Sequence, residues 1–254
     1  MMLSELKNKI ELMWNGEKVD ISIIKHVLEL MKQGEIRVAE KHNGKWLVNT
    51  WLKQAILLAF KHFPTKSQSG DAFDKFGLLP YEGTYRKVPG SIIRDYVHIS
   101  ENAVIMPSCI NIGAYIGTKT MIDMNAVIGS CAQIGTNCHI SAMACIGGVL
   151  EPAVAMPTII EDNCLIGAKS AILEGVVIEE NSVIAAGTTI TASTKIIERD
   201  TGRILNGIVP SGAVVVPGSY QSRNCNINCA VIVKYISSEN LETKNVNEIL
   251  REVS

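Results

Sequence analysis

Two acidic residues in the middle of the chain, Asp123 and Glu174, interrupt runs of aliphatic, small and turn-forming residues. A carboxylate can hold an ammonium group or take a proton from it, so either residue could act on an amine. Upstream, Arg86 carries a guanidinium that could bind a carboxylate through two parallel hydrogen bonds. Each also has a structural explanation, since Asp123 could cap its own turn and the other two could be solvated surface charges.

Histidines and cysteines limit the other kinds of chemistry. A hydroxyl acyltransferase needs a histidine base and a β-helical zinc enzyme needs three histidine ligands, but only His98 and His139 fall within the repeated region described next. We therefore expect no metal, and we expect His139 to be a surface or interface residue rather than a base. The seven cysteines include no Cys-x-x-Cys pair, and their odd number is typical of reduced thiols in the cytoplasm.

A six-residue repeat of isoleucine places these residues. The repeat comprises Ile110, Ile116, Ile122, Ile128, Ile134, Ile140 and Ile146, and then Ile160, Ile166, Ile172, Ile178, Ile184, Ile190 and Ile196. Four residues after each isoleucine stands a small or β-branched residue, so both positions point to the inner face of a short strand, and a turn-tolerant residue often follows the isoleucine at the corner. Units that bury their apolar face only against their neighbours form solenoids, so the period predicts a parallel β-helix with one hexad per face.

Two interruptions of the repeat predict excursions from the coil. Between Ile146 and Ile160 lie Pro152 and Pro157, which cannot stay in a strand ladder and indicate an external loop. We count this 14-residue interval as two hexads plus two extra residues. The stretch 198–207 is expected to form a hairpin before the coil resumes at 208–209.

The chain divides into four expected segments. Residues 1–65 are predicted to form a small helical domain, with helices on either side of a β-hairpin at Asn43-Gly44 and a helix stop at Gly34. A loose connector is expected at 66–89, the β-helix at 90–217 and a C-terminal extension at 218–254. The predicted fold class is therefore mainly β.

Composition narrows the function classes further. The chain has 254 residues, 19% of them charged, and a formal net charge of −1, so we expect neither nucleic acid nor an anionic membrane as a partner. We recognise no signal peptide and no apolar run long enough to span a bilayer, which favours a cytoplasmic location.

Several segments carry a more specific pattern. They are Ile36-Arg-Val-Ala-Glu-Lys, Met106-Pro-Ser-Cys-Ile-Asn-Ile-Gly, Thr120-Met-Ile-Asp, Gly129-Ser-Cys-Ala-Gln-Ile-Gly, Ile146-Gly-Gly-Val-Leu-Glu-Pro, Pro157-Thr-Ile-Ile-Glu-Asp-Asn-Cys and Cys229-Ala-Val-Ile-Val-Lys. Together they resemble the tetrahydrodipicolinate N-succinyltransferases of lysine and diaminopimelate biosynthesis, over almost the whole chain.

The resemblance implies a fold and a reaction. It implies a left-handed parallel β-helix with three hexads per coil, assembled as a homotrimer with active sites between subunits. It also implies transfer of succinyl from succinyl-CoA, as co-substrate and without a tightly bound cofactor, to the amino group of 2-amino-6-oxopimelate. With three hexads per coil, our count of eight hexads separates Asp123 and Glu174 by about 13 Å along the axis.

The resemblance also assigns roles to residues. Asp123 and Glu174 match the catalytic acids, and Arg86 together with Asp123 matches the substrate-binding residues. The expected coenzyme A wall consists of Gly167, Ala168, Ala185 and Gly187, with Lys195 directed to the phosphates.

The sequence departs from the family pattern close to these residues. Asn125 replaces a usual aromatic residue, and Ser141-Ala-Met-Ala-Cys replaces a glycine-rich stretch. Two alternatives therefore stay open: a hexapeptide acetyltransferase with another acyl donor or acceptor, and a non-enzymatic trimeric scaffold.

Overall fold

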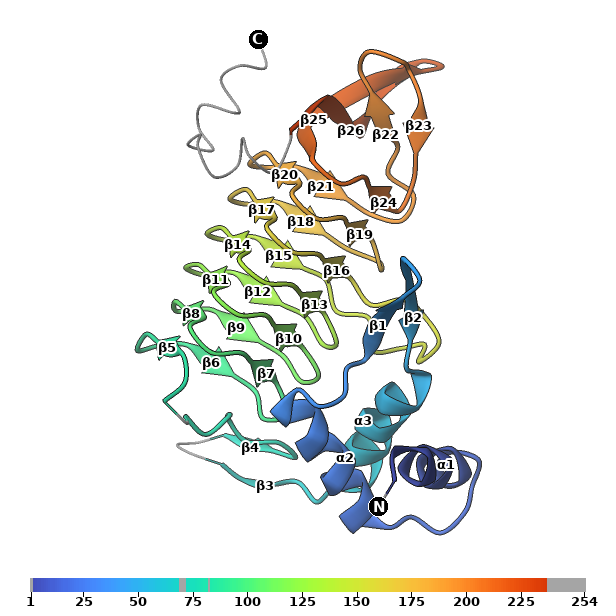
Figure 1. The fold of residues 1–254 in the computed structure, drawn as a ribbon, viewed down its shortest axis with the longest axis vertical. Helices are drawn as coiled ribbons and strands as arrows, with labels where there is room; N and C mark the ends of the chain where they lie inside the picture. Colours follow the sequence, from blue (N-terminus) through green and yellow to red (C-terminus); the bar gives the residue numbers. More distant parts are fainter. Residues whose placement is uncertain (1, 69–71, 82, 237–254) are drawn as a thin grey trace.

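The computed structural model describes residues 2–68, 72–81 and 83–236, and Figure 1 shows a long stack of coils with three helices beside its lower half. The part of the expected C-terminal extension beyond residue 236 lies outside the described residues. In the described part of the chain, every helix is too short or too polar to cross a membrane.

The N-terminal segment has the predicted order of elements: α1 (Leu3–Trp14), α2 (Ile21–Gln33), β1 (Ala39–His42), β2 (Lys45–Val48) and α3 (Thr50–His62). Helix α2 starts where the Asp20 carboxylate accepts a hydrogen bond from the Ser22 N–H, and it ends at Gly34, whose φ of 79° is left-handed. The β1–β2 hairpin turns through Asn43 and Gly44, both with positive φ. The predicted hairpin and helix stop are thus confirmed.

Most of residues 86–209 wind into a parallel β-helix with three faces. The first face contains β7 (His98–Ile99), β10 (Tyr115–Ile116), β13 (Gln133–Ile134), β16 (Ile159–Ile160), β19 (Val177–Ile178) and β24 (Ile208–Val209). The second contains β5 (Arg86–Lys87), β8 (Val104–Ile105), β11 (Met121–Ile122), β14 (His139–Ile140), β17 (Leu165–Ile166) and β20 (Val183–Ile184). The third contains β6 (Ile92–Ile93), β9 (Cys109–Ile110), β12 (Val127–Ile128), β15 (Cys145–Ile146), β18 (Ala171–Ile172) and β21 (Thr189–Ile190).

The isoleucine repeat forms the core of this coil. Each isoleucine lies above its counterpart one coil away, as Ile122 pairs with Ile140 and Ile140 with Ile166. All fourteen repeat isoleucines are buried, with exposures of 2% or less. The prediction that the repeat points inward through every coil is confirmed.

Glycines that follow an isoleucine serve close packing between coils. A Cβ atom on Gly129 would lie 2.1 Å from the backbone nitrogen of Gly148, and one on Gly167 would lie 2.4 Å from that of Ala186. The left-handed backbone of the corner instead falls two residues later, as at Asn125 (φ 58°). Our placement of the turn directly after the isoleucine was therefore two residues early.

The external loop is a longer insertion than we counted. Strand β16 pairs directly with β13, with Gln133 opposite Ile159, so β15 and β16 are consecutive strands and the loop of residues 147–158 replaces no strand. From β11 to β18 there are seven strand steps, not eight. The predicted separation of about 13 Å between Asp123 and Glu174 is thus wrong, and two and one-third coils give about 11 Å.

The two ends of the coil contain structure that the sequence did not reveal. The hairpin β22 (Ile196–Glu198) with β23 (Ile204–Leu205) is confirmed, but the long antiparallel pair β25 (Ala213–Ser222) and β26 (Cys225–Tyr235) was missed. The expected loose connector includes the short pair β3 (Lys66–Ser67) and β4 (Phe73–Asp74), and its Phe76 and Leu79 are buried. The first coil strand, β5, starts at Arg86, four residues before the expected boundary.

Candidate active site

One edge of the coil contains Asp123 and three of the residues expected to line coenzyme A. We call it the Asp123 edge: it consists of Asp123, Ser141, Gly167 and Ala185, each directly after a strand of the second face, together with the residue that follows each. Successive members lie one coil apart, because β11, β14, β17 and β20 pair in parallel without a register shift. Asp123 therefore lies about 10 Å below Gly167 along the axis.

The Asp123 carboxylate has a defined orientation. Its Oδ1 accepts a hydrogen bond of 2.7 Å from the N–H of Met124. Asp123 therefore caps its own turn, as the structural explanation of this residue predicts. Its Oδ2 lies 3.3 Å from Nε2 of His139, in the next coil. The Asp123 and His139 side chains are 25% and 41% exposed, so solvent can reach both.

Sequence reasoning missed this contact, although a signal was present. His139 lies eighteen residues after Met121, which is one complete coil, and the two residues are paired in register. Its outward side chain thus lies directly above strand β11, which ends just before Asp123. His139 is a surface residue, as expected, but it contacts the main candidate acid.

Arg86 lies on the same face as Asp123. It is exposed at the start of β5 and pairs with Val104, which in turn pairs with Met121. Two full coils separate Arg86 from Met121, or about 10 Å along the axis. Among the described residues the Arg86 side chain has no ion-pair or hydrogen-bond partner.

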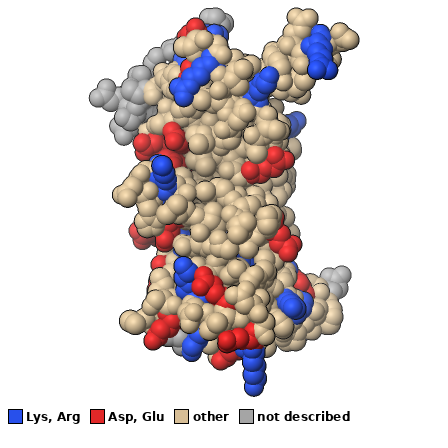
Figure 2. Space-filling model, turned by 90° about the vertical axis from the view of Figure 1, so that its right-hand side faces the viewer, with Lys and Arg blue, Asp and Glu red and all other residues tan. Residues whose placement is uncertain are grey.

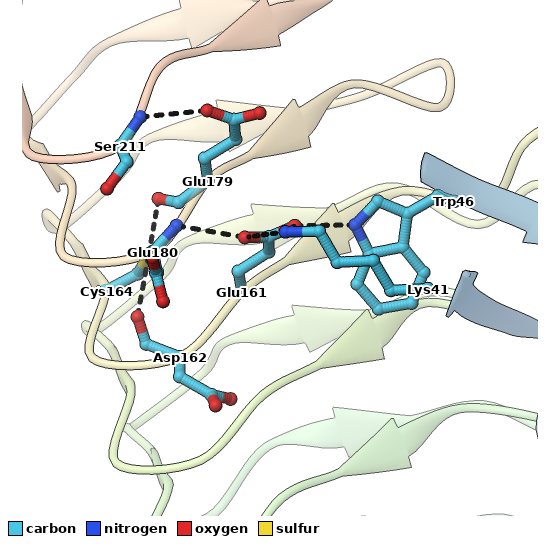
Figure 3. Close-up of polar contacts among 8 residues, drawn as sticks. All are labelled: Lys41, Trp46, Glu161, Asp162, Cys164, Glu179, Glu180 and Ser211. Carbon is cyan, nitrogen blue, oxygen red and sulfur yellow. Dashed lines mark hydrogen bonds and ion pairs between the residues drawn. The ribbon is translucent and has the colours of Figure 1, made fainter. Parts of the chain in front are cut away.

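Glu174 lies on a different edge of the coil, after the third face. Its exposed carboxylate accepts a hydrogen bond of 3.2 Å from the N–H of Ala192 in the next coil. Glu161 and Glu179 cap the corner N–H groups of Glu180 and Ser211 in the same way (Figure 3). Glu174 thus has a structural function within its own chain, and the fold of one chain does not bring it to Asp123.

The expected coenzyme A wall follows the Asp123 edge upward. The N–H groups of Gly167, Ala185 and Gly187 already donate to carbonyl oxygens of adjacent coils, so they are not free donors. Gly167 is also buried, so only Ala185 and Gly187 of these three expose surface to a ligand. The N–H groups of Ala142, Ala168 and Ala186, stacked one coil apart on the same edge, have no acceptor among the described residues. Lys195 lies near the top, with its Nζ 4.1 Å from the centre of the Tyr220 ring.

A second polar cluster fixes the N-terminal hairpin to the coil, as Figure 3 shows. The buried Glu161 carboxylate lies 2.7 Å from Lys41 Nζ and accepts a 2.6 Å hydrogen bond from Trp46 Nε1. The hydrogen bond with Glu161 raises the pKa of Lys41. A cavity of about 250 Å³ lies beside this cluster, lined also by Arg37 and Asp162. The Lys41 ammonium group neutralises the Glu161 carboxylate within this cluster. We therefore interpret Lys41, Trp46 and Glu161 as a structural contact between hairpin and coil, and we call it the latch.

The buried cysteines are unreactive. Burial raises the pKa of the Cys131 thiol to about 12, and it also raises the pKa of Cys164. A protonated thiol is a poor nucleophile and metal ligand.

Among the described residues no group of three or more His, Cys, Asp or Glu side chains is arranged to hold a metal ion. On the face shown in Figure 2, the drawn Lys and Arg residues are interspersed with Asp and Glu.

Comparison with known proteins shows the family. Residues 5–62 match the model of the tetrahydrodipicolinate N-succinyltransferase N-terminal region, residues 113–148 the bacterial transferase hexapeptide, and residues 157–192 the hexapeptide repeat of succinyl-transferase. A 2,3,4,5-tetrahydropyridine-2,6-dicarboxylate N-succinyltransferase of Wolbachia sp. subsp. Brugia malayi is 45% identical over 99% of this chain and 100% of its own. The protein of that name from Caulobacter vibrioides is 42% identical over 98% and 100%.

The chain belongs to the tetrahydropyridine-2,6-dicarboxylate N-succinyltransferase family. Membership makes it an acyltransferase and confirms the resemblance found in its motifs. A solved Campylobacter jejuni structure, named as a 2,3,4,5-tetrahydropyridine-2-carboxylate N-succinyltransferase, superimposes with a TM-score of 0.57 at 19% identity. The match covers 85% of this chain and 63% of that one, and it supports the left-handed β-helical fold.

The departures from the family pattern lie at corners of the coil. Asn125, where an aromatic residue is usual, has a φ of 58°, a conformation that asparagine adopts readily. Met143, in the stretch that is usually glycine-rich, has a φ of 61° and is 53% exposed. Both residues are on the corners of the Asp123 edge, so they change the lining of the candidate site while the acid stays in place.

Proposed function

We propose that the chain transfers the succinyl group of succinyl-CoA to the amino group of ring-opened tetrahydrodipicolinate, 2-amino-6-oxopimelate. The observation that carries this proposal is the position of Asp123 at the lower end of an edge lined with small residues. An acid that can bind an ammonium group thus lies directly below the edge along which we propose that the extended acyl-CoA arm binds. No tightly bound cofactor is required, since the thioester is already activated.

The substrate is a dicarboxylate with an amino group, and the second face offers groups of matching charge. Arg86 would bind a carboxylate while Asp123, about 10 Å away along the axis, would hold the amine. That separation suits opposite ends of a seven-carbon chain. The free Arg86 guanidinium supports this assignment.

Coenzyme A would lie along the Asp123 edge. The carbonyl oxygens of pantetheine could accept hydrogen bonds from the free N–H groups of Ala168 and Ala186, beside the accessible surface of Ala185 and Gly187. Lys195 would face the phosphates. The N–H of Ala142, one coil above Met124, is the free donor nearest to Asp123 on this edge and would stabilise the oxyanion of the tetrahedral intermediate.

The complete site would form between subunits of a homotrimer. Asp123 and Glu174 are on different edges of the β-helix of one subunit, so they could approach one another only across an interface between subunits. In a trimer whose axis runs parallel to the coil, their height difference of about 11 Å would persist. Glu174 would then act at a different point of the extended site from Asp123. We place this enzyme in the cytoplasm, where succinyl-CoA is available.

Release of the coenzyme A thiol tests this function and its rivals. We expect thiol release from succinyl-CoA that depends on the aminopimelate substrate and exceeds release from acetyl-CoA. Equal release from acetyl-CoA would show that succinyl-CoA is not the preferred acyl donor. This outcome matters because Asn125 and Met143 alter the lining of the site. Absence of release from either donor would contradict the proposed function.

A further inference from the structure

The Asp123 carboxylate and the His139 imidazole form a pair on the Asp123 edge. One carboxylate oxygen is held at 2.7 Å by the Met124 N–H, and the other lies 3.3 Å from His139 Nε2. Contacts on both oxygens fix the plane of the carboxylate. If Nε2 carries the hydrogen and donates it to the carboxylate, Nδ1 presents a lone pair.

Strand pairing on both sides holds the backbone of His139 in place. Its strand β14 lies between β11 and β17, and its N–H donates to the Cys164 carbonyl at 2.9 Å. Its neighbours in register, Met121 and Leu165, are uncharged, and Ser141 and Gly167 follow on the edge. Among the described residues, Asp123 is the one charged group in contact with the imidazole, and Nδ1 has no hydrogen-bond partner.

We propose that His139, oriented by Asp123, takes the proton from the substrate amine. This inference rests on the proposed function. An imidazole is an ordinary base near neutral pH, whereas an ordinary carboxylate is a much weaker one. In this refinement Asp123 holds the imidazole through Nε2 instead of holding the amine itself, and Nδ1 accepts the proton.

The proton balance of this step is complete. The ammonium group of the substrate gives one proton to His139 Nδ1, which releases it to solvent. The free amine forms a C–N bond to the thioester carbonyl, and collapse of the tetrahedral intermediate breaks the C–S bond. The second proton lost from nitrogen ends on the thiol of coenzyme A.

The test compares three histidine variants in the thiol-release assay. His139→Gln keeps a donor toward Asp123 but offers no basic nitrogen, and we expect kcat/KM to fall about 100-fold to 10,000-fold and the acid limb of its pH profile to disappear. His139→Ala should be partly rescued by added imidazole, because the half-exposed side chain leaves an open site. His42→Gln is the matched control, since the His42 side chain is 60% exposed on the N-terminal hairpin and lies 3.5 Å from the Glu40 carboxylate.

The outcomes separate this inference from the proposed function. Activity of His139→Gln within about twofold of the wild type, with the same pH profile, would overturn the role of His139 and leave Asp123 to act directly. Failure of imidazole to restore any activity to a folded His139→Ala protein would also count against a proton acceptor. Lack of thiol release by the wild type would overturn the proposed function itself.

Discussion

The ammonium group of Lys53, fully buried in helix α3, donates a hydrogen bond of 2.6 Å to the carbonyl oxygen of Ala155 in the external loop. This contact ties the insertion between β15 and β16 to the helical domain. Burial lowers the pKa of Lys53, because the loss of hydration disfavours the charged form. A buried amine of this kind makes stability depend on pH.

The first prediction concerns that dependence. Between the lowered pKa and the ordinary lysine value, the unfolded chain binds the proton more tightly than the folded chain, so the stability contribution of Lys53 rises with pH. The wild type has a free energy of unfolding that differs from that of the Lys53→Met variant. This difference, wild type minus variant, should therefore increase from about pH 7 to about pH 10. Lys61→Met, an exposed change in the same helix, should show no such trend. An equal difference at both pH values would contradict the assignment.

The second prediction concerns the latch between the N-terminal hairpin and the coil. Lys41→Met leaves the buried Glu161 carboxylate without its cation, and it should cost about 1–2 kcal/mol because the 40% exposed Lys41 side chain is partly screened by water. The raised pKa of Lys41 means that its contribution is present below the ordinary lysine pKa and is lost as pH rises through the raised value. Urea unfolding of both single variants and of the double variant with Glu161→Gln measures the coupling. Strict additivity would show that the latch contributes nothing.

The third prediction concerns the isoleucine core. Ile166 is fully buried between Ile140 and Ile184, so Ile166→Ala should lower the free energy of unfolding by about 2–5 kcal/mol. Ile208 is 48% exposed, and Ile208→Ala should change it by no more than about 0.5 kcal/mol. Thermal or urea unfolding of the pair checks the register. Similar losses for both variants would argue against it.

The inward register was predictable because a period of six with a paired small residue leaves one arrangement that buries every isoleucine. The length of the external loop was not. Fourteen residues fit two hexads plus two as well as one hexad plus eight, and only the pairing of Gln133 with Ile159 decides between them. The contact of Glu161 with Lys41 joins residues 120 positions apart, so no local pattern predicts it. Asp123 and His139 could have been related by counting one coil, but the motif alone names only the acid.

The fourth prediction uses the strained corner at Met143. A left-handed conformation costs a residue with a Cβ atom roughly 1–2 kcal/mol, and glycine avoids this cost but gains flexibility in the unfolded chain. Met143→Gly should therefore stabilise the fold by about 1 kcal/mol, since the side chain is 53% exposed. Asn125→Gly, at the corresponding corner one coil below, should be nearly neutral. Destabilisation by Met143→Gly would mean that the methionine packs against a neighbouring subunit.

The most direct test of the account is the rate of thiol release from succinyl-CoA by Asp123→Asn, with the aminopimelate substrate present. The amide keeps the size of the side chain and an oxygen that can cap the Met124 N–H, but it cannot balance the charge of an ammonium or imidazolium group. We expect the assembly state of the wild type by light scattering, which we propose is a trimer, and a kcat/KM at least about 100-fold below the wild type. Turnover by a trimeric Asp123→Asn protein at the rate of the wild type would contradict an active site at the Asp123 edge.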